Sequence, residues 1–393
     1  MLSEEIIHET SNAIWVKSQL CEIAPFVYGK GLPAGKRVDG EIPVYGSNGV
    51  VGSHNEALVS EPVVVIGRKG SVGEVHLTSG PSWPIDTTFY VKSSNKVDLD
   101  FLFYLLRTLP LKTNSDSAVP GLSRDYAHSL EIRAPNVAMQ TAIGKVLQSI
   151  DFKIANNSAL SKTLEEIAQT IFKSWFVDFD PVKAKMASEK PVGMDDATAA
   201  LFPDSMQESE LGPIPVGWSV STLKEFAPFV YGKALKADLR QEGTVPVYGS
   251  NGVVGVHNDS LTNSSAVIIG RKGTVGNVNL CLQPAWIIDT GYFSIPVDVS
   301  DVYLTYFSLK TLGLEKMNSD AAVPGLNRDE AHRQKIVVGD AAIRKRFSEV
   351  VELLFAQVNS LQEQSKLLFE TRDRLLPRLI SGELQIPEEM LMS

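Results

Sequence analysis

The chain has 393 residues, 44% of them hydrophobic, and a formal net charge of −9. This length predicts about two to three domains with ordinary globular cores. No apolar run is long enough to cross a membrane, and the N-terminal residues do not resemble a secretory signal. The acidic charge disfavours a protein that binds nucleic acid through bulk charge, although basic faces can still be local. Cys21 and Cys281 are not equivalent positions in the repeat described below, so we expect no disulfide framework, no zinc site and a cytoplasmic protein.

An internal repeat organises the chain. Residues 43–75 read PVYGSNGVVGSHNEALVSEPVVVIGRKGSVGEV, and residues 246–278 match them at 22 of 33 positions. The segment PFVYGK also occurs twice, at residues 25–30 and 228–233, and AVPGL occurs at 118–122 and 322–326. Residues ~13–135 and ~216–338 are therefore two copies of one domain.

Within each copy, β-branched runs alternate with Gly, Pro and Asn. Residues 62–67 and 89–91 predict strands in the first copy, and residues 266–270 predict a strand in the second. Residues 99–109 and 303–312 have helical spacing. The fold class that we predict is α+β.

Each copy is followed by a long heptad pattern, in which apolar or small residues recur at alternating steps of four and three. The first ladder comprises Ile143, Leu147, Ile150, Ile154, Asn157, Ser161, Leu164, Ala168, Ile171 and Trp175. The second comprises Phe347, Val351, Leu354, Val358, Leu361, Ser365, Leu368, Arg372, Leu375 and Leu379. Two related helices of this length predict an antiparallel coiled coil, unless each packs on its own domain. Residues 1 to about 180 could then dimerise, because the first helix could replace the second at every equivalent heptad position.

The order domain, helix, domain, helix predicts a pseudo-two-fold cyclic arrangement. Pro181 ends the first ladder, and Gly382 is a candidate C-cap for the second. The predicted boundaries are 1–136 for domain 1, 137–180 for the central helix, 181–214 for a linker, 215–338 for domain 2, 339–381 for the C-terminal helix and 382–393 for a tail.

Signatures of catalysis are mostly absent from the sequence. Residues 29–37, GKGLPAGKR, lack the spacing of a phosphate-binding P-loop, and residues 67–73 lack that of a dinucleotide loop. His54, His257, His128 and His332 recur in both copies without a neighbouring Cys or second His, so we interpret them as structural.

Two repeated loops are candidates for binding. The motif YGSNG, at residues 45–49 and 248–252, combines a ring, a hydroxyl, an amide and two glycines. Asn can pair with adenine through two hydrogen bonds, but Asn-Gly also favours a tight hairpin turn. Both interpretations stay open.

The second loop holds Arg68–Lys69, repeated as Arg271–Lys272, between glycines, where paired cations suit phosphate or guanine. A solvated turn is the alternative. The candidate binding residues occupy equivalent positions in the two copies. In the first copy they are Lys30, Tyr45, Ser47, Asn48, Arg68, Lys69, Lys112, Ser123 and Arg124. Their counterparts in the second copy are Lys233, Tyr248, Ser250, Asn251, Arg271, Lys272, Lys316, Asn327 and Arg328.

The whole chain resembles the specificity subunit of type I restriction-modification enzymes. The resemblance rests on the PVGW segment at residues 215–218, the GRKG[ST]VG loops and the PGL[SN]RD segments. It also rests on the sequence LEEIAQTIFKSWFVDFDPVKAKM at the end of the first predicted helix and on LLPRLISGEL at the end of the second.

This resemblance implies two target recognition domains, each reading half of a split site in double-stranded DNA, with a coiled coil that sets their spacing. It implies a non-catalytic, prokaryotic cytoplasmic subunit that assembles with two modification subunits and with restriction subunits. S-adenosylmethionine, ATP and Mg²⁺ would be bound by those partners and not by this chain. No membrane partner is implied.

The near-identity of the two copies adds a prediction of its own. If both domains carry the same loop residues, the two halves of the target have the same sequence in inverted orientation, an interrupted palindrome. Gly35–Lys36 against Asp238–Leu239, and Ser123 against Asn327, are positions where asymmetry could enter. The alternative class is a coiled-coil scaffold with two duplicated domains that do not bind DNA.

Overall fold

The computed structural model describes residues 15–112, 121–317 and 325–386. The chain divides into two units, which we describe separately: unit 1 is Met1–Ser158 with Gln362–Ser393, and unit 2 is Ala159–Leu361. Residues 118–120 and 322–324 of the AVPGL segments, the start of predicted domain 1 and the end of the predicted tail lie outside the described residues.

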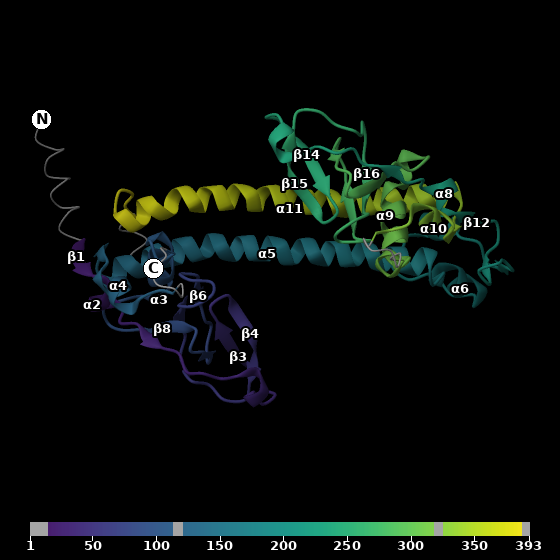
Figure 1. Cartoon of the computed structure of the whole chain (residues 1–393). Helices are drawn as coiled ribbons and strands as arrows, with labels where there is room; N and C mark the ends of the chain where they lie inside the picture. Colours follow the sequence, from purple (N-terminus) through teal and green to yellow (C-terminus); the bar gives the residue numbers. More distant parts are fainter. Residues whose placement is uncertain (1–14, 113–120, 318–324, 387–393) are drawn as a thin grey trace, which may run out of the picture. The chain divides into compact units, whose positions relative to one another are not determined.

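Unit 1 contains the first copy of the repeated domain (Figure 1). Its sheets are two-stranded β1–β9, four-stranded β2–β8–β5–β6 and three-stranded β4–β3–β7. The strands are β1 (Val16–Gln19), β2 (Val27–Tyr28), β3 (Ile42–Gly46), β4 (Gly49–His54), β5 (Val63–Gly67), β6 (Val75–Leu77), β7 (Trp83–Pro84), β8 (Thr88–Lys92) and β9 (Glu131–Ala134). The helices are α2 (Leu20–Ile23), the 3-10 turn η1 (Ala34–Lys36), α3 (Leu99–Thr108) and α4 (Arg124–Ser129).

Unit 2 repeats this plan, with sheets β12–β20, β13–β19–β16–β17 and β15–β14–β18. The strands are β12 (Ser219–Thr222), β13 (Val230–Tyr231), β14 (Val245–Gly249), β15 (Gly252–His257), β16 (Ala266–Gly270), β17 (Val278–Cys281), β18 (Trp286–Ile287), β19 (Gly291–Ser294) and β20 (Lys335–Val338). The helices are α8 (Leu223–Phe226), η2 (Ala237–Leu239), η3 (Val299–Asp301), α9 (Val302–Thr311), η4 (Leu314–Lys316) and α10 (Arg328–His332).

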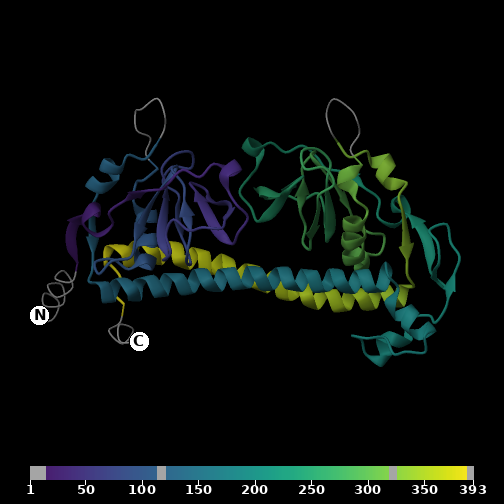
Figure 2. The ribbon, with the colours of Figure 1, turned by 90° about the horizontal axis from the view of Figure 1, so that it is seen from below.

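Two long helices run through both units. Helix α5 (Val137–Phe176) begins in unit 1 and ends in unit 2, and α11 (Ala341–Ser381) begins in unit 2 and ends in unit 1. Each unit therefore contains an antiparallel pair of helix segments beside its sheets (Figure 2). Every rung of both predicted ladders is buried or half-buried. The predicted α+β class, with two repeated domains and two long antiparallel helices, is confirmed.

The cores follow from the β-branched strands and the helix pair. All five residues of β5 and all five of β16 are buried, as expected for strands covered on both faces. The core of unit 1 extends onto the end of α11 through Leu379 and Ile380. At Gly382 the φ angle is +80°, and a Cβ would lie 2.6 Å from the Trp15 ring, so both its conformation and its packing require glycine, as the C-cap prediction anticipated.

The segment predicted as a linker, 181–214, contains regular structure. Helix α5 ends at Phe176, and Pro181 lies in the first turn of the next helix, α6 (Asp180–Met186), where its missing N–H costs nothing. Helix α7 (Asp196–Ala200) and the strand pair β10 (Met206–Gln207) with β11 (Ile214–Pro215) follow. Phe202 is buried in the core of unit 2 and packs edge-on against Trp175.

Candidate nucleic-acid interface

The YGSNG motif forms the tip of a hairpin in each unit. Strands β3 and β4 are joined by the two residues Ser47 and Asn48, and Gly49 has φ +99°. In unit 2, Ser250 and Asn251 join β14 to β15, and Gly252 has φ +113°. The tight-turn interpretation is therefore correct, and it leaves both asparagine side chains exposed.

The hairpin tip rests on the Arg68–Lys69 loop. The buried hydroxyl of Ser47 donates to the backbone carbonyl of Lys69. In unit 2 a Cβ on Gly273 would lie 3.3 Å from Ser250 Oγ, so the same two loops meet. The Ser47 hydroxyl thus has a structural role in holding the two loops together, and the DNA contact expected for Ser47 from the sequence stays a prediction.

A Tyr–Arg–Arg cluster lies beside this junction. The guanidinium carbons of Arg68 and Arg124 each lie 5.0 Å from the centre of the Tyr28 ring. Arg68 Nη1 also donates to the backbone oxygen of Asp86 at 2.9 Å. Such cation–π contacts hold two like charges in one place.

Unit 2 has the same cluster with the same geometry. Arg271 and Arg328 each lie 4.9 Å from the Tyr231 ring, and Arg271 Nη1 donates to the oxygen of Asp289 at 3.2 Å. Tyr28 and Tyr231 are both 47% exposed. Neither tyrosine was among the predicted site residues, although both lie in the repeated PFVYGK segment, which was the available signal.

The second arginine of each cluster, Arg124 or Arg328, has one side-chain nitrogen without a hydrogen-bond partner among the described residues. Nε of Arg124 and Nε of Arg328 are buried and donate no hydrogen bond to any residue that the structure describes. The neighbouring carboxylates of Asp125 and Asp329 lie at 4.0 and 3.6 Å, which is beyond hydrogen-bond distance. Two guanidinium groups on one exposed ring form a site for an anionic, planar or bidentate partner, such as a phosphate or a guanine edge.

The predicted lysines differ in their exposure and in the groups that they contact. Lys69 and Lys272 are exposed beside the clusters, and Lys30 and Lys233 each lie 5.7 Å from the ring of Trp83 or Trp286. Lys112 is neutralised by Glu74 at 2.7 Å, and this contact lowers the pKa of the Glu74 carboxyl.

In unit 2, Asn277 stands where Glu74 stands in unit 1. Lys316 is exposed there without that carboxylate. The charge at this paired position therefore differs between the two units.

Other predicted site residues have structural roles. Ser123 is the N-cap of α4 and accepts from the Tyr126 amide, and Asn327 caps α10 by accepting from Asp329 and Glu330. Tyr45 and Tyr248 are half-buried, and burial raises the pKa of both hydroxyls.

The histidines accept hydrogen bonds from backbone amides, as the structural interpretation expected. His128 Nε2 accepts from Phe26 at 2.9 Å, and His332 Nε2 accepts from Phe229 at 2.8 Å. His54 and His257 accept through Nδ1 at 3.0 Å from Val38 and Gln241. Burial lowers the pKa of His128 and of His332, so the neutral acceptor form is favoured.

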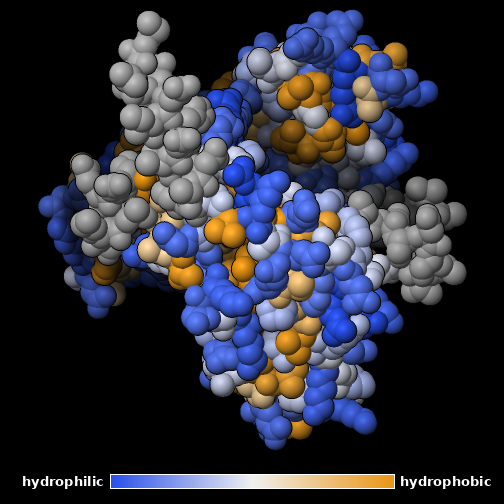
Figure 3. Space-filling model, turned by 90° about the vertical axis from the view of Figure 1, so that its left-hand side faces the viewer, coloured by the Kyte–Doolittle hydropathy of each residue, from blue (hydrophilic) through white to orange (hydrophobic). Residues whose placement is uncertain are grey.

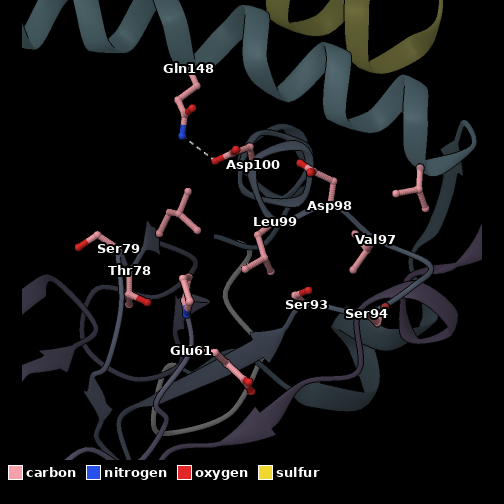
Figure 4. A pocket seen from close by; sticks show the side chains of 13 residues that line it. Glu61, Thr78, Ser79, Ser93, Ser94, Val97, Asp98, Leu99, Asp100 and Gln148 are labelled. Atoms are coloured by element: carbon pink, nitrogen blue, oxygen red, sulfur yellow. Dashed lines mark hydrogen bonds between the residues drawn. The ribbon is translucent and has the colours of Figure 1, made fainter. Parts of the chain in front are cut away.

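A cavity of about 840 Å³ in unit 1 lies between the domain and the start of α5 (Figure 4). Three carboxylates line it, from Glu61, Asp98 and Asp100, and Gln148 donates to Asp100 Oδ1 at 2.8 Å. Burial raises the pKa of Asp100. A cavity of this charge would repel phosphate, so it is not part of the candidate interface.

The described residues were also compared with the arrangements that metal ions and membranes require. Among them, no group of three or more His, Cys, Asp and Glu side chains is arranged to hold a metal ion. None of the helices in this part of the chain combines the length and apolar character that crossing a membrane requires.

Comparison with known proteins defines the class. Residues 12–166 and 215–336 match the family described as the type I restriction modification DNA specificity domain. The chain belongs to this family. The predicted role in sequence-specific DNA recognition within a type I restriction-modification system is thereby confirmed, and the alternative of a scaffold that does not bind DNA is not supported.

Individual relatives agree with this assignment. The chain is 26% identical over 374 residues to the type I restriction enzyme HindI specificity subunit of Haemophilus influenzae, covering 77% of this chain and 82% of that protein. It is 23% identical over 355 residues to the MjaIX specificity subunit of Methanocaldococcus jannaschii, covering 83% and 78%. The fold is similar to that of the S subunit from M. genitalium, with a TM-score of 0.61, 19% identity and coverage of 93% and 96%.

Proposed function

We propose that this chain is the non-catalytic recognition subunit of a type I restriction-modification complex, and that its two domains read the same half-site in inverted orientation. The target would be an interrupted palindrome in double-stranded DNA. The observation that carries this proposal is the duplication of the Tyr–Arg–Arg cluster and of the hairpin tip, with cation–π distances that agree within 0.1 Å between units.

Base readout depends on which side chains reach the groove and how they are held. Tyr28, Arg68 and Arg124 have identical counterparts in Tyr231, Arg271 and Arg328. Asn48 and Asn251 occupy the same position in hairpins of the same length. Two surfaces that present the same groups in the same geometry favour the same bases.

The rest of the complex would supply the chemistry. The helices α5 and α11 would set the spacing between half-sites and dock two modification subunits, and restriction subunits would join them. S-adenosylmethionine, ATP and Mg²⁺ would be bound by those partners, in the cytoplasm of a prokaryote. The net charge of −9 fits a subunit whose affinity for DNA is completed by other chains.

The test is to express this chain with its modification subunit and to sequence the methylated positions in the host DNA. We expect a bipartite motif whose two halves are inverted copies. Two unrelated half-sites would overturn the palindrome, and the absence of any sequence motif would overturn the assignment to DNA recognition.

A purified complex allows a second measurement. Replacing Arg68 and Arg271 together with alanine should weaken binding to the methylated motif by at least tenfold, since each loses a charge-assisted contact. The matched control is Lys92→Ala, because Lys92 is an exposed cation paired with Glu61 at 2.8 Å and lies outside the clusters.

A further inference from the structure

The tip of each hairpin exposes two kinds of side chain together. Asn48 is exposed and makes no hydrogen bond within the described residues, and Val50, two positions on, is 59% exposed. In unit 2, Asn251 is exposed and Val253 is also 59% exposed. Hydrophobic side chains reach the surface of unit 1 on the face seen in Figure 3. Each tip therefore exposes an amide beside methyl groups, and neither group has a partner among the residues that the structure describes.

The tip is braced by an arginine from the preceding segment. Arg37 Nη1 donates to the backbone oxygen of Val51 at 2.7 Å. The next residue, Gly52, has φ +144°, and a Cβ there would lie 2.7 Å from Arg37 Nη1. The glycine therefore makes room for the guanidinium.

Unit 2 repeats this brace. Arg240 Nη1 donates to Val254 at 2.6 Å, and a Cβ on Gly255 would lie 2.6 Å from that nitrogen. The brace and the contact of Ser47 with the Lys69 backbone hold the hairpin from two sides. A tip held in this way loses little conformational freedom on binding.

We propose, resting on the function proposed above, that β3–β4 and β14–β15 are the base-reading elements and enter the major groove. The groove admits a two-stranded ribbon. The Asn48 amide would pair with N6 and N7 of an adenine, and the Val50 methyls would contact a thymine methyl of an adjacent base pair.

The cations of the same domain place the phosphate contacts next to this tip. Lys69 is exposed, and its backbone oxygen accepts from Ser47 at the tip itself. Arg68 precedes it and belongs to the Tyr–Arg–Arg cluster. Double-stranded DNA offers both the polyanionic backbone for these cations and the donor, acceptor and methyl groups for the tip. Arg37 is a positioning residue, because its guanidinium contacts the hairpin backbone.

The decisive variants are Asn48→Ala and Asn48→Asp, each in the full chain with its modification subunit. Sequencing of methylated sites should show that N48A relaxes one position in one half-site by about ten- to a hundredfold. N48D should shift the preference at that position from adenine toward cytosine, whose amino group a carboxylate accepts. N251A should do the same to the other half-site, so each domain is the control for the other.

Asn95 provides a matched control, since it is an exposed asparagine in a turn away from the hairpin, and N95A should leave the motif unchanged. R37A should relax the same position as N48A while the salt dependence of DNA binding stays the same, and R37K should restore part of the selectivity.

An unchanged motif in N48A, N48D and N251A would overturn the hairpin as reader. It would leave the proposed function standing if the wild-type half-sites are inverted copies. Loss of all binding in R37A with an unaltered motif in N48A would also count against this proposal.

Discussion

In unit 1, a polar cluster joins the domain to the helix pair. The Tyr104 hydroxyl donates to Asp151 Oδ2 at 2.7 Å, and Arg372 Nη1 donates to Oδ1 of the same carboxylate at 2.7 Å. The Arg372 side chain is 11% exposed and that of Asp151 is 29% exposed. Domain, first helix and second helix each contribute one member.

In unit 2, the equivalent positions are apolar. The repeat offset places Phe307 at the position of Tyr104, Phe355 at that of Asp151 and Ala168 at that of Arg372. All three belong to one buried core, in which the Phe307 and Phe355 ring centres lie 6.2 Å apart.

The comparison separates two kinds of constraint. The exposed Tyr–Arg–Arg clusters match in residue and distance, whereas the buried joints differ completely in chemistry. Several different sets of side chains can fill a buried contact between domain and helices, provided that they fit in shape and satisfy their hydrogen bonds. A surface that must contact one fixed partner can be formed by only a few sets of side chains. The matched surfaces fit the half-site that we propose both domains share, and the different joints distinguish one half of the chain from the other.

The difference also bears on whether the first half could dimerise, which stays a prediction. If helix one replaced helix two, Ala168 would stand in place of Arg372. Asp151 would then lose its guanidinium partner, and an unpaired, half-buried carboxylate is costly. The pairing of Asp151 with Arg372 therefore disfavours a dimer in which the first helix takes the place of the second.

The largest expected effect is in the aromatic core of unit 2. Phe347 is fully buried and contacts Phe172, Phe176 and Phe307. Phe347→Ala should lower the free energy of unfolding by about 3–5 kcal/mol, measured by chemical denaturation. Phe152→Ala is the control, because Phe152 is 67% exposed, and it should change stability by about 0.5 kcal/mol or less. Similar losses in both variants would refute this account of the core.

The next effect tests the polar joint of unit 1. Arg372→Ala should cost about 2 kcal/mol, less than for a fully buried pair because Asp151 keeps some contact with water. The triple variant Y104F/D151F/R372A converts the joint to the residues of unit 2 and should recover most of that loss, since no charge is left unpaired. A triple variant less stable than R372A would show that the apolar solution cannot be transferred.

A smaller effect separates helix capping from DNA contact. Ser123→Ala and Asn327→Ala should each lower stability by about 1 kcal/mol through loss of the N-cap. The methylated motif should stay the same in both variants. A changed motif without a change in stability would instead support the DNA contact predicted for these two residues.

The smallest effect is a pH dependence. The pKa of His128 and of His332 is lowered from 6.5, chiefly by burial. The two imidazoles contribute fully to the free energy of unfolding at pH values above 6.5, their ordinary pKa in the unfolded chain. This contribution declines as the pH falls below that value, because the unfolded chain then takes up protons more readily than the folded one. Between pH 7.5 and 5, H128Q/H332Q should lose less stability than the wild type in denaturant titrations. If the variant and the wild type lost the same amount of stability between these pH values, neither imidazole would contribute to the pH dependence.

Much of this molecule could be predicted from the sequence because the responsible interactions are local or periodic. The duplicated loops gave the two domains. The heptad spacing predicted two long helices, observed as α5 and α11, and Asn-Gly before a β-branched run indicated a hairpin tip as one of two open interpretations. The sequence pattern alone therefore determined the architecture, the position of the candidate loops and the family.

The tertiary structure decided which of those loops act together. Tyr28 meets Arg68 and Arg124 only because the strand order β2–β8–β5–β6 and the bridge between Lys69 and Gly121 bring distant segments to one place. It also assigned Ser47 and Ser123 to backbone hydrogen bonds, and it revealed the Arg37 brace on the hairpin. Residue type and spacing carry no information about such contacts, because they depend on how the sheets pair and not on any local preference.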